Sequence, residues 1–172
     1  MVLNRKKFES VLLYILKRCG SYPQVGKTVI YKLLYFSDFN YYELYEKHLT
    51  GEIYRKIDRG PAPCNLEKIA DEMIEENKLQ KIEISLDGKK QIKQIKYLPL
   101  IDPDLSVLNA REIKVINDVI SEISPMNASQ ISAYSHGDMP WKATGDKEII
   151  DYELVFYRDP VYSVREYEND EE

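Results

Sequence analysis

The stretch that decides the predicted fold is KTVIYKLLYFSDFNYYELY, residues 27–45. Its apolar side chains recur three and four positions apart, which is the spacing of one face of a helix. In the first half of the stretch, apolar residues occupy nearly every side. A helix of that kind lies in the middle of a bundle or in an interface. We therefore expect a helix over residues 27–45 at the centre of the fold.

Tyrosines and one carboxylate share a further face of this helix. Tyr31, Tyr35, Tyr42 and Tyr45 fall on it together with Asp38. A carboxylate here can be buried and satisfied by phenol hydroxyls, in a polar network that fixes helix packing, and we favour this interpretation for Asp38. The alternative is a polar-aromatic surface for a protein partner, because tyrosine is common in interfaces. The residues predicted to bind a partner are Tyr35, Asp38, Tyr42, Tyr45 and Trp141.

Capping patterns predict further helices on both sides of the central one. Asn4 is a predicted N-cap for a helix that ends at Gly20, and Asn65 is a predicted N-cap for another. Asn109 and Asn127 each precede a glutamate or glutamine three positions later, which is the pattern of a capping box. The chain is therefore predominantly helical.

One segment has the alternating pattern of strands. Residues 81–98 alternate around Asp87-Gly88, which predicts an antiparallel hairpin. Residues 148–157 fit either a strand or an extended closing segment. The predicted fold class is thus mainly α (α+β), a compact helical domain with a small antiparallel β-hairpin. We expect a single domain over 1–165 and a mostly acidic, disordered tail over 166–172.

Composition narrows the classes of function. The chain has 172 residues and a net charge of −5, which argues against strong nucleic-acid binding by the chain as a whole. Its fourteen tyrosines suit half-buried core positions or a partner-binding surface. Cys19 and Cys64 have no metal-ligating neighbours, and His48 and His136 are far apart, so we expect no metal site. The sequence has no nucleotide-binding loop, so we expect no cofactor. No apolar run is long enough to span a membrane, and we expect a cytoplasmic protein.

Two groups of motifs, about a hundred residues apart, carry a family resemblance. They are KLLYFSDFNY at 32–41 with LTGE at 49–52 and Gly60-Pro61, and then SHGDMPWK at 135–142. Together they resemble the Panacea domain, a SocA-like family formerly described as phage-associated proteins. The resemblance extends over roughly residues 8–156.

The resemblance implies an antitoxin of a toxin–antitoxin pair, which neutralises a cognate protein toxin by direct contact. Whether the chain also self-associates stays open. The residues expected to organise the fold and the binding surface are Gly60, Pro61, His136, Gly137 and Pro140. Gly60 should adopt a backbone conformation that a side chain would strain, and Gly137 should end a helix in the left-handed region.

A catalytic alternative starts from Ser135, His136 and Asp138. A nucleophile and its base must face each other across a site, with the third group behind the base. Neighbours in sequence rarely achieve that arrangement, and no glycine-flanked nucleophile turn surrounds Ser135. We therefore predict that the chain is not an enzyme.

A nucleic-acid alternative starts from the basic hairpin over 81–96, which follows a helix as the wing of a winged-helix domain does. Its basic residues are Lys81, Lys89, Lys90, Lys93 and Lys96. The candidate recognition helix over 128–134, however, carries no lysine or arginine to contact bases and phosphates. The hairpin lysines also fit a solvated face that protects a sheet edge. Nucleic-acid binding is therefore the second interpretation.

Overall fold

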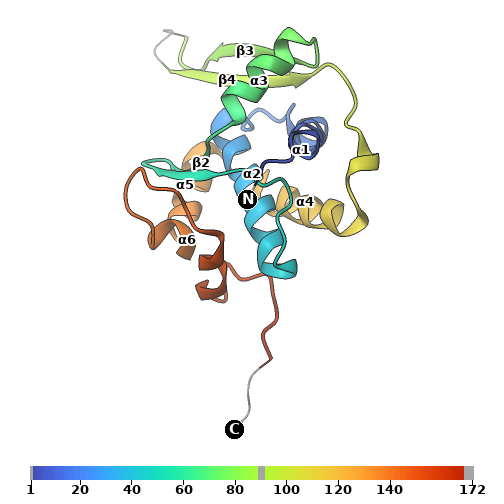
Figure 1. Ribbon diagram of the computed structural model, residues 1–172. Helices are drawn as coiled ribbons and strands as arrows, with labels where there is room; N and C mark the ends of the chain where they lie inside the picture. Colours follow the sequence, from blue (N-terminus) through green and yellow to red (C-terminus); the bar gives the residue numbers. More distant parts are fainter. Residues whose placement is uncertain (1, 89–91, 169–172) are drawn as a thin grey trace.

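The structure, a computed structural model, describes residues 2–88 and 92–168 of the chain. Helix α2 (Lys27–Tyr45) runs through the middle of the molecule, with the bounds predicted from the sequence (Figure 1). It packs against helices on both sides and against strands of both hairpins. Leu33, Leu34 and Phe39 have no solvent exposure. The apolar side chains around α2 are therefore buried by a different element on each side.

Two long helices cover one side of α2 (Figure 1). They are α1 (Arg5–Cys19) and α4 (Ala110–Ile123), and the short 3-10 helix η1 (Leu105–Val107) leads into the second. Asn4 accepts a backbone N–H at the start of α1, as predicted. Asn109 and Glu112 form the predicted capping box of α4.

Shorter helices cover the other side of α2 (Figure 1). They are α5 (Ala128–His136), α6 (Met139–Lys142) and the 3-10 helix η2 (Tyr152–Tyr157). Asn127 and Gln130 form the second predicted capping box, at the start of α5. The segment 148–157 makes one isolated bridge, between Ile149 and Arg55, before it turns into η2. Residues 32–41 of the first motif region belong to α2, and the second motif region, at the end of α5 and in α6, lies against this helix.

The predicted hairpin lies with a helix at one end of the molecule (Figure 1). Its strands are β3 (Leu79–Ser85) and β4 (Lys93–Pro99), and the helix is α3 (Leu66–Glu75). The strands pair antiparallel from Leu79 opposite Pro99 to Ser85 opposite Lys93. Among the described residues, no helix is long and apolar enough to cross a membrane.

A second hairpin, formed by β1 (Tyr54–Ile57) and β2 (Gly60–Pro63), was not predicted. Glycine and proline are typical of connections between elements, because proline removes a donor from a strand, so the sequence of β2 does not have the pattern of a strand. The structure tolerates its glycine and two prolines because β2 has only one strand partner, β1, among the described residues. The fold class is nevertheless confirmed: the domain is mainly α with small antiparallel β elements.

Candidate functional site

Asp138, in the second motif region, anchors a buried ion pair. Arg158 donates from Nε to Oδ1 and from Nη2 to Oδ2 of Asp138, both at 2.9 Å, and Tyr35 Oη donates to Oδ2 at 2.7 Å. The side chains of both charged residues have no solvent exposure. Two parallel hydrogen bonds of this kind offset the cost of taking the charges out of water. The motif therefore ties α6 to α2 and to the chain beyond η2.

Glu43 extends this network to the C-terminal segment. Arg158 Nη1 donates to Glu43 Oε1 at 3.1 Å, and the Tyr167 hydroxyl donates to Oε2 at 2.9 Å. The Ser163 hydroxyl donates to the same carboxylate at 2.6 Å, and the Val164 amide at 3.1 Å. We call Glu43, Asp138 and Arg158 the ionic clamp. It fixes residues 158–167 against the last turns of α2.

The clamp includes residues that sequence reasoning missed. Glu43 belongs to a stripe that periodicity did not single out, and its only signal was a carboxylate within an aromatic helix. Arg158 had no signal, because its partners lie 20 and 115 positions away. Residues 169–172 of the predicted tail lie outside the described residues. Tyr167, also in that tail, contacts Glu43.

Asp38 has the buried position that the favoured interpretation gave it, but other partners. It accepts from the Thr50 amide at 2.9 Å, from the Thr50 hydroxyl at 2.8 Å and from Tyr54 Oη at 2.5 Å. None of these donors belongs to the tyrosine face of α2. Burial raises the pKa of Asp38 to about 7, although these hydrogen bonds act to lower it. Asp38 therefore fixes the LTGE motif and β1 to α2.

The five residues predicted to bind a partner do not form one patch. Tyr35 and Asp38 are 0% and 1% exposed, so in this structure they support the surface from beneath. Tyr45 is half-buried beside Tyr41, with the Arg111 guanidinium 5.2 Å from its ring centroid on the α4 side. Tyr42 and Trp141 lie elsewhere, and each belongs to a different aromatic group.

Tyr42 belongs to an aromatic cluster at the end of α2. Its ring centroid lies 4.9 Å from that of His48, 5.4 Å from that of Tyr152 and 6.0 Å from that of Phe156. The cluster borders an open cavity of about 360 Å³, which we call the Tyr42 hollow. Ile149, which is 54% exposed, also lines it. The half-buried Tyr42 ring and the exposed side chains of His48 and Ile149 thus meet at one depression.

Trp141 belongs to a stacked group with a cation. Its ring stacks on His136 with centroids 4.2 Å apart, and Lys56 Nζ, from β1, lies 3.9 Å from the Trp141 centroid. Trp141 Nε1 and His136 Nε2 are closed to solvent and have no hydrogen-bond partner among the described residues. Stacking therefore holds these two side chains. Pro140 is buried at the start of α6, where proline is well tolerated.

Gly137 corrects one expectation. Its φ is −84°, so it does not end α5 in the left-handed region. A Cβ at this position would instead lie 2.0 Å from the hydroxyl of Tyr162, which donates to the Tyr134 carbonyl. A Cβ here would therefore require the Tyr162 side chain to move away from α5. Sequence reasoning could not detect this contact, because Tyr162 belongs to the C-terminal segment.

Gly60 and Pro61 pack against Lys32 of the first motif region, and Gly60 also lies against Ser135 of the second. Gly60 has φ +109°, in the region that favours glycine, as predicted. The Pro61 carbonyl accepts a hydrogen bond from Lys32 Nζ at 3.2 Å. A Cβ at Gly60 would lie 2.4 Å from Ser135 Oγ and 2.7 Å from Lys32 Cε. The first hairpin is thus packed directly against α2 and α5.

The catalytic alternative has no geometric support. The Ser135 hydroxyl donates to the Ser132 carbonyl at 2.9 Å, His136 stacks on Trp141, and Asp138 binds Arg158. The three side chains thus have separate partners. The described residues contain no group of side chains suited to hold a metal ion.

The basic hairpin gives the nucleic-acid alternative no support either. Lys93 pairs with Glu83 at 3.3 Å, and Lys96 is 7% exposed and donates to the Tyr22 carbonyl at 2.6 Å. Lys89 and Lys90 lie outside the described residues. The lysines that the structure describes thus include one that is paired and one that is buried.

Comparison with protein families shows to which family the chain belongs. The model for the family described as antitoxin SocA-like, Panacea domain, matches residues 30–142. The chain belongs to this family. No curated protein and no solved structure matches it. The Panacea match runs from the first turns of α2 to the end of α6, so it includes Glu43 and Asp138 but not Arg158.

Proposed function

We propose that the chain is the antitoxin of a toxin–antitoxin pair and neutralises its toxin by direct protein–protein contact. Its membership of the Panacea family supports an antitoxin role and a protein partner in general. The observation that carries direct contact is the Tyr42 hollow, where the half-buried Tyr42 ring and the exposed His48 and Ile149 side chains line one open cavity. Tyrosine is among the residues that most often anchor protein interfaces.

The hollow is held in shape by the buried networks below it. Tyr152 stacks on Phe39 at 4.1 Å and donates to the Glu52 carbonyl at 2.6 Å. Tyr42 also donates to the carboxylate of Glu153. A preformed site loses less entropy on binding than a mobile one. Tyr45 and Trp141 are the further contacts that we propose, with Tyr35 and Asp38 as their buried support.

Gene neighbourhood tests the function itself. Each open reading frame next to the gene for this chain is expressed alone and then together with the chain. We expect one neighbouring product to stop growth alone, growth to return on co-expression, and the two proteins to co-purify. Rescue without co-purification would contradict neutralisation by contact, and the absence of any toxic neighbour would contradict the antitoxin role.

Substitution of Tyr42 tests the hollow. Tyr42→Ala should weaken toxin binding by roughly 30-fold, because a central aromatic anchor contributes about 2 kcal/mol. Tyr22→Ala removes an exposed tyrosine that does not line the hollow and should leave affinity unchanged. Calorimetry measures both affinities, and thermal melting shows that both variants are folded. Equal affinity of the two variants, together with an unaffected Ile149→Asp variant, would place the toxin elsewhere.

A further inference from the structure

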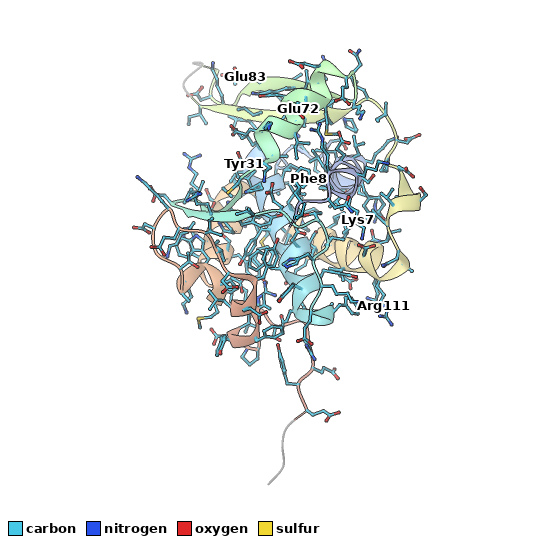
Figure 2. The ribbon with its side chains drawn as sticks, in the orientation of Figure 1. Lys7, Phe8, Tyr31, Glu72, Glu83 and Arg111 are labelled. Carbon is cyan, nitrogen blue, oxygen red and sulfur yellow. The ribbon has the colours of Figure 1, made fainter. Side chains whose placement is uncertain are left out.

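A cavity of about 450 Å³ opens at the start of α2, between the two hairpins. Tyr31, which lines it, lies between β2 and the β3–β4 hairpin in Figure 2. The basic side chains around the cavity are Lys27, Lys32, Arg59 and Lys93. None of the described residues that line it is acidic. We call this cavity the Lys32 pocket.

The charges around the Lys32 pocket do not balance. Lys27 pairs with Glu67, and Lys93 pairs with Glu83. Within the described part of the chain, neither Lys32 nor Arg59 forms an ion pair. Two basic side chains at the cavity therefore lack a carboxylate partner among the described residues.

Lys32 is the unusual member of this set, because it has no solvent exposure. An ammonium group has three N–H donors. The hydrogen bond recorded for Lys32 Nζ among the described residues goes to the Pro61 carbonyl, at 3.2 Å. Burial, and then the charge of Arg59, lower the pKa of Lys32 to about 7. An anion in the pocket would supply both the missing acceptor and the missing charge.

Two helices also begin at the Lys32 pocket. Lys27 and Thr28, from the first turn of α2, line it together with Ala128, the first residue of α5. The N-cap of α2 is Gly26, which provides no side-chain acceptor, and the first turn contains no acidic residue. The first amides of a helix need acceptors, and the helix dipole favours an anion at this end. The uncapped start of α2 therefore adds to the positive potential of the cavity, whereas the start of α5 already has its capping box at Asn127.

We propose that the Lys32 pocket binds the phosphate group of a small phosphate monoester, between Lys32 and Arg59. A phosphate monoester carries a charge of about −1.5 to −2 at neutral pH, and its negative field favours the protonated form of Lys32, so Lys32 and Arg59 together balance it; a single carboxylate would balance only one of them. Its oxygens can accept from several directions, as the pocket requires. The aliphatic side chains of Ile57, Leu86 and Ile92 line the same cavity and receive the apolar part of the ligand. The cavity volume is that of an ordinary small-molecule site. This site is separate from the Tyr42 hollow.

The test uses the chain alone, so its result does not depend on the toxin. AMP serves as the probe, with adenosine, inorganic phosphate and a glutamate-rich peptide as comparisons, in calorimetric titrations at low ionic strength. We expect saturable binding of AMP, weaker binding of inorganic phosphate and no binding of adenosine. Lys32→Met keeps an unbranched side chain, one atom shorter, without the charge, and Arg59→Gln changes an exposed turn residue. Each should weaken AMP binding at least tenfold.

The control lies on the same hairpin. Arg55→Gln removes an equal charge from β1 outside the cavity lining and should change AMP affinity by less than twofold. Loss of AMP binding in Arg55→Gln to the same extent would show nonspecific attraction and overturn the proposal. Absence of saturable AMP binding would overturn it as well, and binding of the acidic peptide in place of AMP would overturn it by identifying a peptide-docking site. If Lys32→Met fails to fold, the AMP affinity of Arg59→Gln still tests the proposal.

Discussion

At the scale of single residues, Asp38 makes the stability of the domain depend on pH. Burial raises its pKa to about 7 in the folded protein, above the ordinary value of about 3.9. Between these two values the folded state holds a proton that the unfolded state has lost. The contribution of Asp38 is therefore fully present at acidic pH and is lost as the pH rises through about 7.

The Asp38→Asn variant tests this linkage. The free energy of unfolding of the wild-type protein should include a component that falls between about pH 4 and pH 7, by on the order of 1 kcal/mol per pH unit. The amide side chain of the variant cannot ionise, so this component should be absent from it. Urea unfolding at a series of pH values measures the difference between the two proteins. Parallel pH profiles would show that Asp38 titrates normally in the folded state.

At the scale of elements, the hairpin β1–β2 depends on one glycine. Gly60 combines φ +109° with close contacts to Ser135 and Lys32, whereas Gly88 has φ +67° and no described atom within 4 Å of the point where a Cβ would lie. A side chain at Gly60 would therefore meet both backbone strain and a steric clash. At Gly88 it would meet only the backbone strain.

Alanine at the two positions separates these effects. Gly88→Ala should cost about 1 kcal/mol of stability, from left-handed backbone alone. Gly60→Ala should cost about 3 kcal/mol or more, because strain and overpacking act together. Equilibrium unfolding gives both values. Equal losses would mean that the hairpin can move away from α2 at little cost.

Local sequence rules predicted the elements that local chemistry determines. The bounds of α2 followed from its apolar residues, and the capping boxes at Asn109 and Asn127 followed from side chains three positions apart. The hairpin β1–β2 was missed because prolines and a glycine usually mark connections. The role of Gly137 was also missed, because it depends on contact with Tyr162, which lies far along the chain in the C-terminal segment.

At the scale of the whole molecule, the ionic clamp links segments that no local rule connects. Glu43 lies near the end of α2, Asp138 begins α6, and Arg158 follows η2. The side chain of each of these residues is closed to solvent. Removal of one partner leaves buried charge without compensation, which costs far more than the loss of a surface ion pair. The candidate contact residues also show the limit of local rules. Tyr42, Tyr45 and Trp141 could be proposed from the sequence, but the distance between them in the fold could not.

Arginine substitutions measure the contribution of the clamp. Arg158→Ala should destabilise the domain by about 3–5 kcal/mol, because Asp138 and Glu43 remain buried without their cation. Arg165→Ala removes a partly exposed arginine, which contacts Glu46 at 3.3 Å, and should cost less than about 1 kcal/mol. Urea unfolding of the two variants provides the comparison. A small effect of Arg158→Ala would show that water enters and solvates the two carboxylates.

The clamp also bears on the order in which the segments of the chain fold. Glu43 and Arg158 are separated by 115 positions, and contacts that close such long loops are costly in chain entropy. Until Arg158 arrives, two carboxylates occupy the interior of a partly folded chain without a counter-charge. We therefore expect the C-terminal segment to dock late in folding and to detach early in unfolding. Native-state hydrogen exchange, in which its amides should exchange before those of α2, measures this.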